Sequence, residues 1–257
     1  MIEFLRTIAQ AAGEKIRSAY YQRNLNIEHK GEIDLVTEVD IACEKIIVEA
    51  IKENFPTDSI LAEESAETSG SSARRWIIDP VDGTTNLAHR FPFVAVSIGV
   101  EENGRLTYGV VYNPILDELF EAQLGKGAYL NGAPIQVSNI DTNKNALIAT
   151  GFPYDRWQRG EYYIREYLAF MQRCQAVRRC GSAAIDLCYC ACGRVDGFFE
   201  RKLHPWDMAA GSLILTEAGG KVTRFDGSRW HYRDDTILAS NSKLHREMQT
   251  ILAHAHD

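Results

Sequence analysis

Two aspartates three residues apart form the most informative pair in this 257-residue chain. Asp79 and Asp82 lie in the segment WIIDPVDGTTN, where an apolar strand ends at Asp79 and Pro80 cannot continue a hydrogen-bond ladder. Gly83 and two threonines then open a helix whose free amides can receive a phosphate. Carboxylates at such a turn can hold Mg²⁺, which prefers oxygen ligands. Because DP and DG are also ordinary turn dipeptides, the segment alone leaves a plain turn open.

Further acidic residues lie at the predicted ends of other elements. Asp40 ends VTEVD, Glu63 and Glu64 end the strand run in LAEES, and Asp207 in HPWDMAAG precedes a helix. Element ends and loops are where catalytic residues concentrate. Four separated carboxylate sites of this kind favour a multi-metal phosphatase over a solvated acidic surface. Asp40 taken alone also fits a helix N-cap.

These residues must be positioned by strands and helices that occur in blocks. We predict an amphipathic helix over residues 1–20 and a second helix in IACEKIIVEAIKENF, joined by the polar connection HKGEIDLVTEVD. Strand runs follow in SILAEE, RWIIDP, FVAVSIGVEENGRLTYGVVYNP and ELFEAQLGKGAYLNGAPIQVS, the third with a hairpin turn at ENGR. Helices are predicted over 161–174, over 182–192 and after HPWD. The pattern indicates a layered α/β architecture.

Composition excludes several function classes. A net charge of −7 argues against a nucleic-acid binder that neutralises phosphates through a basic surface. No apolar run approaches the ~18 residues that suggest a membrane span, and the N-terminus lacks a signal peptide pattern, so we expect a cytoplasmic protein. Its six cysteines are then reduced. Cys188, Cys190 and Cys192 could suggest a metal site, but a buried helix with small apolar thiols is favoured.

Two long motifs resemble the signatures of the inositol monophosphatase family. WIIDPVDGTTN is similar to the central signature and HPWDMAAGSLILTEAGG to the second, while VTEVD and LAEES resemble two further family elements in the same order. The resemblance spans residues 30–225. It implies one domain over 1–257 with an α/β (α+β) fold, a layered αβαβα sandwich of the inositol monophosphatase and fructose-1,6-bisphosphatase type. It also implies a homodimer and inhibition by Li⁺.

The resemblance further implies a cofactor of two or three Mg²⁺ ions, with Mn²⁺ as a substitute. The first ion would be held by Glu63, Asp79 and the carbonyl of Val81, and the second by Asp79, Asp82 and Asp207. A third ion would lie near Glu63 and the loop of residues 30–34. Thr84, paired with Asp40 and supported by Glu64, would orient the attacking water. Substrate contacts would come from Gly83, Thr84, Gly181, Ser182, Ala183 and Glu200.

The expected activity is Mg²⁺-dependent hydrolysis of a small phosphate monoester, inositol 1-phosphate in the first instance. Direct attack by a metal-activated water is favoured over a nucleophilic aspartate, because the aspartates are needed as ligands. Alternative substrates are 3′-phosphoadenosine 5′-phosphate and fructose 1,6-bisphosphate, whose second phosphate could contact Arg156, Arg178, Arg201 or Lys202. A regulatory or scaffold protein on the same fold is the non-enzymatic alternative.

Several other side chains carry two interpretations at this point. His204 could be a catalytic base, although packing beneath the WD turn is favoured. Trp76 and Trp206 are expected to be core aromatic residues beside the site. Aromatic residues outside the site could form a dimer interface or pack inside; these are Tyr154, Trp157, Tyr162 and Tyr163.

Overall fold

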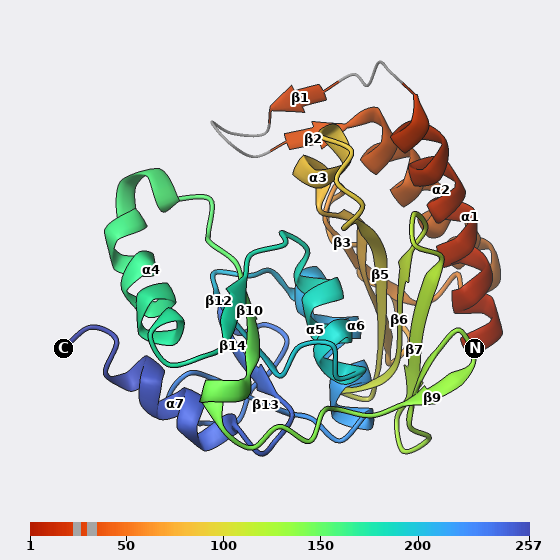
Figure 1. Cartoon of the computed structure of the whole chain (residues 1–257). Helices are drawn as coiled ribbons and strands as arrows, with labels where there is room; N and C mark the ends of the chain where they lie inside the picture. The colour runs from red at the N-terminus through yellow and green to blue at the C-terminus, as the bar shows by residue number, and fades with distance from the viewer. Residues whose placement is uncertain (23–26, 30–34) are drawn as a thin grey trace.

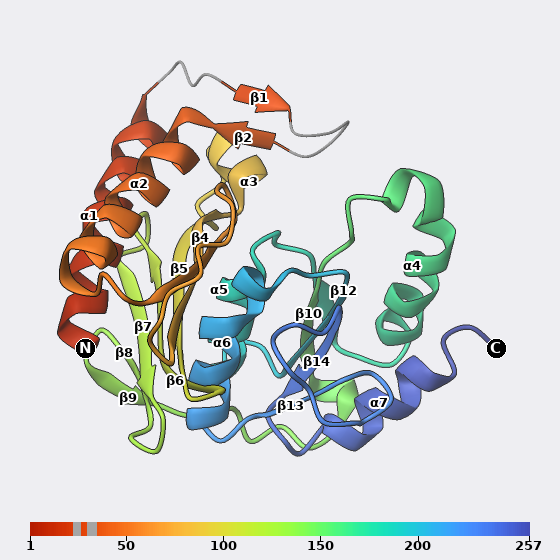
Figure 2. The same cartoon turned by 180° about the vertical axis from the view of Figure 1, so that it is seen from behind.

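The computed structural model describes residues 1–22, 27–29 and 35–257 and has five layers (Figure 1). Helices α1 (Ile2–Tyr21) and α2 (Glu38–Asn54) cover one face of a seven-stranded sheet, and α5 (Ala183–Ala191) and α6 (Pro205–Glu217) lie between this sheet and a five-stranded one. Helices α4 (Arg156–Met171) and α7 (His245–Ala253) cover the far face of the second sheet, as the reverse view also shows (Figure 2). The predicted αβαβα order is therefore confirmed. None of the described helices is long and apolar enough to cross a bilayer.

The larger sheet is mostly the predicted meander. Its strands are β3 (Ser59–Ala62), β4 (Arg74–Asp82), β5 (Ala95–Glu102), β6 (Arg105–Asn113), β7 (Glu118–Gln123), β8 (Ala128–Leu130) and β9 (Ala133–Ile135), paired in that order. Only β3 and β4 run parallel. Asn103 and Gly104 turn β5 into β6 with positive φ at both positions, which is the hairpin predicted at ENGR.

The smaller sheet has the order β11 (Ala176–Arg178), β10 (Leu147–Thr150), β12 (Gly197–Arg201), β14 (Thr236–Ser240) and β13 (Lys221–Thr223). Strand β10 is parallel to both of its neighbours, whereas β14 is antiparallel to β12 and β13. A short helix α3 (Thr84–Ala88) follows β4, and a 3₁₀ turn (Asn143–Asn145) precedes β10. Helix α6 follows strand β12 after a short connection. Glu200 near the end of β12 and Asp207 near the start of α6 therefore lie in the same region.

The strand that carries Asp79 and Asp82 runs further than predicted, so its expected end at Asp79 is wrong. Strand β4 continues to Asp82, and its pairing with β5 shifts from Asp79 opposite Ser97 to Asp82 opposite Ala95. The extra residue is a β-bulge, which accommodates Pro80 because that residue cannot donate to the ladder. Side chains three apart in a regular strand point to opposite faces. The bulge brings both aspartates to the same face.

Two other predicted boundaries also need correction. The polar connection between the first two helices contains the antiparallel strands β1 (Ile27–His29) and β2 (Leu35–Thr37). Helix α4 begins five residues before the predicted start and ends at Met171. Its first turn lacks the apolar periodicity that indicated the later part, and the non-helical φ of −121° at Arg159 marks a kink. The predicted helix over 182–192 is confirmed to within one residue, with Ser182 as its N-cap.

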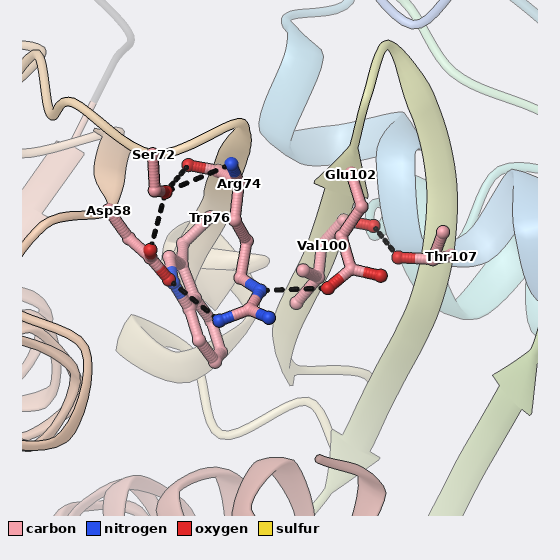
Figure 3. Close-up of polar contacts among 7 residues, drawn as sticks. All are labelled: Asp58, Ser72, Arg74, Trp76, Val100, Glu102 and Thr107. Carbon is pink, nitrogen blue, oxygen red and sulfur yellow. Dashed lines mark hydrogen bonds and ion pairs between the residues drawn. The ribbon is translucent and has the colours of Figure 1, made fainter.

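A polar network fixes the start of β4 at the end away from Asp82 (Figure 3). The carboxylate of Asp58 accepts hydrogen bonds from Ser72 Oγ at 2.6 Å and from Trp76 Nε1 at 2.9 Å. Arg74 bridges Asp58 and Glu102, which belongs to the neighbouring strand β5. These bonds hold β4 in register with β5, and that register determines where the bulge and its two aspartates fall.

Helix α6 approaches the larger sheet closely because two strand positions are glycine. A Cβ atom at Gly109 would lie 2.8 Å from the carbonyl oxygen of Ala210, and one at Gly99 would lie 3.0 Å from Ala209 Cβ. Real Cβ atoms rarely come so close to other heavy atoms, so either side chain would push the helix outward. The depth at which α6 packs therefore depends on these glycines. Since Asp207 is in its first turn, they also fix the distance of Asp207 from β4.

The first prediction concerns this close packing. Gly109→Ala should destabilise the fold by about 1–3 kcal/mol, because overpacking a tight contact costs that much. Gly160→Ala in α4 is the matched control, since nothing lies within 4 Å of the added Cβ, and it should be neutral or stabilising by up to about 1 kcal/mol. Urea unfolding measures both. Equal midpoints for the two variants would contradict a packing limit at Gly109.

Candidate active site

One cavity collects most of the residues predicted for the site. It lies where β3, the bulge of β4, α3, the start of α5, the end of β12 and the start of α6 meet. Among the predicted residues, those that line it are Glu63, Asp79, Val81, Asp82, Gly83, Thr84, Gly181, Ser182, Ala183, Glu200 and Asp207. Asp40 and Glu64 are not in the cavity wall.

The carboxylates of the cavity raise one another's pKa. Asp79 is only 1% exposed, and its pKa lies well above the usual range because of burial first and then because of Glu63, Asp82 and Asp207. Burial and Asp82 likewise raise the pKa of Asp207. Like charges this close in a poorly solvated site cannot all ionise without compensation. The four acids therefore behave as one electrostatic group with a strong demand for positive charge.

Two of these acids also accept hydrogen bonds that fix their positions. Asp82 Oδ2 accepts hydrogen bonds from Ser182 Oγ at 2.6 Å and from the backbone N–H of Ala184 at 2.7 Å, which ties β4 to the start of α5. Burial raises the pKa of Asp82 to about 6 although these donors lower it. Asp207 Oδ2 accepts from the N–H of His204 at 2.7 Å and so caps α6. Both carboxylates are positioned before any ligand binds.

Thr84 and Asp40 form the predicted pair. Thr84 Oγ1 donates to Asp40 Oδ1 at 2.8 Å, and the other oxygen of Asp40 accepts from the backbone N–H of Thr37 at 2.9 Å. Thr37 is the N-cap residue of α2, so an N-cap role for Asp40 itself is wrong. Asp40 at the third helical position closes the capping box by accepting from Thr37, and it is also the partner of Thr84. Burial raises the pKa of Asp40, while the bonds from Thr37 and Thr84 oppose that shift.

Glu64 follows Glu63 directly but does not line the cavity. Its backbone N–H donates to Glu44 Oε2 at 2.8 Å, which links the end of β3 to α2. Gly83, by contrast, is part of the wall and has a φ of 100°. A side chain there would be strained and its Cβ would lie 2.8 Å from the carbonyl oxygen of Phe93, so glycine is required at the start of α3.

Glu200, which also lines the cavity, packs over a glycine. A Cβ at Gly151 would lie 2.1–2.2 Å from the carboxyl atoms of Glu200, so this carboxyl group occupies the space that a side chain would fill. Burial raises the pKa of Glu200 to about 8, against the opposing effect of Arg179. Burial therefore favours the protonated form of Glu200, which can both donate and accept hydrogen bonds.

The cavity also contains residues that sequence reasoning did not place there. Arg179 comes from the segment before Gly181, Arg156 and Tyr154 come from the start of α4 and the loop before it, and Trp206 lies on α6. Arg179 lies in the segment 178–183, which resembles the family strand and turn that face the substrate, although it was not itself predicted as a contact. Arg156 was considered only as one of several basic candidates. Tyr154 was expected outside the site.

The remaining aromatic expectations have mixed outcomes. Tyr163 is buried and donates to Asp155 at 2.7 Å, so an interface role for it is wrong, whereas Trp157 is 66% exposed. Trp76 is a core residue as expected, but it does not line the cavity. His204 is exposed and its ring stacks on Trp206 at 4.9 Å between centroids.

The oxygen-rich wall fits hard divalent cations such as Mg²⁺. Carboxylates and a backbone carbonyl are the ligands that such ions prefer, and the raised pKa values indicate that these acids ionise together only at a cost unless positive charge compensates them. In the described residues no group of three or more His, Cys, Asp or Glu side chains already has the arrangement of a metal cluster. The acids contact each other instead, and Glu63 shares a hydrogen bond with Asp79. The loop expected to help hold a third ion, residues 30–34, lies outside the described residues.

The cysteines do not contribute to this wall. All six are free, and Cys188 and Cys190 are fully buried in α5. Burial raises the pKa of both thiols well above the usual range, so they remain protonated, apolar core groups. The expectation of a buried helix at this place is confirmed.

Comparison with known proteins agrees with this geometry. A model of the inositol monophosphatase family matches residues 1–257. Inositol-1-monophosphatase of Synechocystis is 45% identical over 254 residues, covering 98% of this chain and 88% of that protein. Nus factor SuhB of Vibrio cholerae is 43% identical over 256 residues, covering 99% and 95%. The crystal structure of extragenic suppressor protein suhB from Bartonella henselae superposes with a TM-score of 0.94 at 40% identity, covering 98% of each chain.

Both signatures quoted from the sequence lie in the matched region, and both contribute acids to the cavity wall. Membership supports phosphatase activity on a small phosphorylated substrate, and metal dependence is general in the family. The chain belongs to the inositol monophosphatase family.

Proposed function

We propose that the chain is a Mg²⁺-dependent phosphatase that hydrolyses inositol 1-phosphate to inositol and phosphate. One observation carries the proposal: four carboxylates from three elements line one cavity, and burial together with their acidic neighbours raises the pKa of the three aspartates. Such an arrangement is costly in a folded protein unless cations compensate it. Metal-assisted phosphate chemistry is the activity that makes use of it.

We propose that Glu63, Asp79, Asp82, Asp207 and the carbonyl of Val81 hold the cations. When bound, these ions compensate the charge of the phosphate and make a water molecule more acidic. A third ion near Glu63 stays a prediction, and Mn²⁺ is expected to substitute. The hydrogen bonds that already fix Asp82 and Asp207 reduce the ordering required when cations bind.

The pair of Thr84 and Asp40 would orient the attacking water. Because Thr84 Oγ1 donates its one proton to Asp40, its lone pairs are left to accept a hydrogen bond from water. Gly83 and Thr84 lie beside this position and would receive the phosphate. Direct attack by water is favoured over a nucleophilic aspartate, since Asp79 and Asp82 are committed to the ions. Glu64 would act only indirectly, through the position of β3.

Glu200 would select a polyol. Its carboxyl group lies over Gly151 in the cavity wall, where it could exchange hydrogen bonds with ring hydroxyls. Gly181, Ser182 and Ala183 also line the cavity and would complete the substrate contacts. The printed name of the Synechocystis relative, Inositol-1-monophosphatase, supports the choice of substrate.

A regulatory role is the second candidate, because the Vibrio relative is named a Nus factor. The two roles are separable by experiment, since a purely regulatory chain would release no phosphate. We further propose that residues 1–257 act as one cytoplasmic domain and pair as a homodimer. The exposed Trp157 on α4 is a candidate for that interface.

The raised pKa values of the cavity carboxylates predict how the stability of the metal-free protein depends on pH. Because the folded pKa of Asp82 is raised to about 6, its contribution to stability is fully present below pH 4 and is lost as the pH rises through 6. The loss is about 3 kcal/mol for a shift of about two units. Thermal unfolding in EDTA should therefore show wild type losing stability relative to Asp82→Asn between pH 4 and 7. A widening advantage for wild type would contradict the assignment.

Phosphate release tests the function directly. Inositol 1-phosphate should be hydrolysed in Mg²⁺ and not in excess EDTA. Asp79→Asn should lower kcat by at least about 1,000-fold, because it removes a charge shared by both ions, while keeping the fold. Asp141→Asn, at an exposed loop position, is the matched control and should retain full activity. Undiminished turnover in EDTA, or a near wild-type rate for Asp79→Asn, would refute the proposal.

A further inference from the structure

Two turns that meet at the cavity come from distant parts of the chain. Residues 83–84 follow β4 at the start of α3 and are proposed to receive the phosphate; they are called the phosphate turn. Residues 180–183 lead into α5 and include the three residues proposed to complete the substrate contacts; they are called the substrate turn. Each turn contains a glycine with positive φ, 100° at Gly83 and 87° at Gly181. A substrate that touches both turns requires a fixed distance between them.

The side chain of Asn86 lies between these two turns. Asn86 belongs to α3, is only 9% exposed and does not line the cavity. Its Nδ2 atom donates to the carbonyl oxygens of Cys180 at 2.9 Å and Gly181 at 3.2 Å, both in the substrate turn. A Cβ atom at Gly83 or at Gly181 would lie 3.4 Å from the same nitrogen. The amide group of Asn86 therefore lies against the backbone of both turns.

A third carbonyl group shares this donor. Asn86 Nδ2 also donates to the carbonyl oxygen of Phe93 at 2.7 Å, the same oxygen that a Cβ at Gly83 would meet at 2.8 Å. An amide nitrogen carries two hydrogens, so the three carbonyl groups must share them. Replacing Asn86 would therefore take a donor from three backbone acceptors at once, in a place with little access for water.

Hydrogen bonds cross between the two segments in both directions. Ser182 and the N–H of Ala184 donate to Asp82, which directly precedes the phosphate turn. Asn86 donates in the opposite direction, from a position just after the phosphate turn. The phosphate turn is thus tied to the substrate turn on both of its sides. Without the amide of Asn86 the link at Asp82 would remain, and the two turns could rotate about it.

We propose that Asn86 is a positioning residue, which sets the spacing between the phosphate turn and the substrate turn and with it the preference for a phosphorylated polyol. The inference rests on the proposed phosphatase function. Because Asn86 is not in the cavity wall, it acts on the substrate through the backbone of the two turns. A small misplacement of groups that hold a substrate is enough to lower the rate of its reaction strongly.

Two substrates separate this role from a general effect on the fold. Inositol 1-phosphate has ring hydroxyls and would use both turns, whereas p-nitrophenyl phosphate has no such hydroxyls and would depend mainly on the phosphate turn. The ratio of their kcat/KM values therefore reports the spacing of the turns. Loss of folded protein lowers both activities equally and leaves this ratio unchanged.

The ratio is measured at saturating Mg²⁺ for wild type, Asn86→Ala and Asn86→Asp. Asn86→Asp keeps the shape of the side chain but replaces the donor nitrogen by an oxygen, so it tests the hydrogen bonds if Asn86→Ala does not fold. Asn241→Ala is the matched control. Asn241 is 2% exposed, lies outside the cavity, and its Nδ2 donates to Ser138 Oγ at 2.8 Å and to the carbonyl oxygen of Ile140 at 2.7 Å.

Both Asn86 variants should lower the ratio of inositol 1-phosphate to p-nitrophenyl phosphate by about 10-fold or more, the usual effect of leaving buried acceptors without a donor. Asn241→Ala should lose stability in thermal unfolding, because it too removes buried hydrogen bonds, and should keep the wild-type ratio. Thermal unfolding also verifies that each Asn86 variant used is folded.

An unchanged or raised ratio in a folded Asn86 variant would overturn the inference, and so would an equal fall in Asn241→Ala. Failure of the proposed function has a different signature, because wild type would then show no EDTA-sensitive phosphate release from either substrate. Release from both substrates by wild type, with the same ratio in the Asn86 variants, would refute the positioning role alone.

Discussion

Repulsion among buried carboxylates is the constraint on which this structure depends. Asp79, Asp82, Asp207 and Glu63 line one wall, and the pKa values of the three aspartates are raised by burial and by their acidic neighbours. The repulsion between these acids does not move them apart, because other interactions determine where each acid lies. The register of β4 and the depth of α6 are set by packing and by hydrogen bonds outside the cavity. A strained group of charges held by a rigid frame is suited to bind cations.

Different structural features position the different acidic side chains. A bulge at Pro80 places two aspartates on one face, which a regular strand cannot do at a spacing of three. Donors at the start of α5 hold Asp82, and the capping bond of α6 holds Asp207. The elements come from distant parts of the chain, so the site forms only when both sheets and the helices between them are packed. Cavity chemistry and fold stability are therefore coupled.

Much of this could be predicted from the sequence, because the acids lie in motifs with strong local signals. The layered α/β class, the hairpin at Asn103 and the helix capped by Ser182 follow from periodicity and turn chemistry, whereas the αβαβα order was implied by the family resemblance. The features that were not predicted depend on contacts between segments that are distant in the sequence. Pro80 suggested the end of a strand, since a bulge is visible only in the pairing with β5. Likewise, no local pattern places Glu200 over Gly151 or Arg156 near Arg179.

The central claim is that the acidic wall exists to hold cations, and isothermal titration calorimetry with Mn²⁺ tests it most directly. The account predicts at least two ions bound per wild-type chain at neutral pH, with protons released because the carboxylates must ionise. It predicts fewer bound ions in Asp79→Asn. Absence of binding to the wild-type protein, or the same stoichiometry and affinity in both proteins, would contradict it.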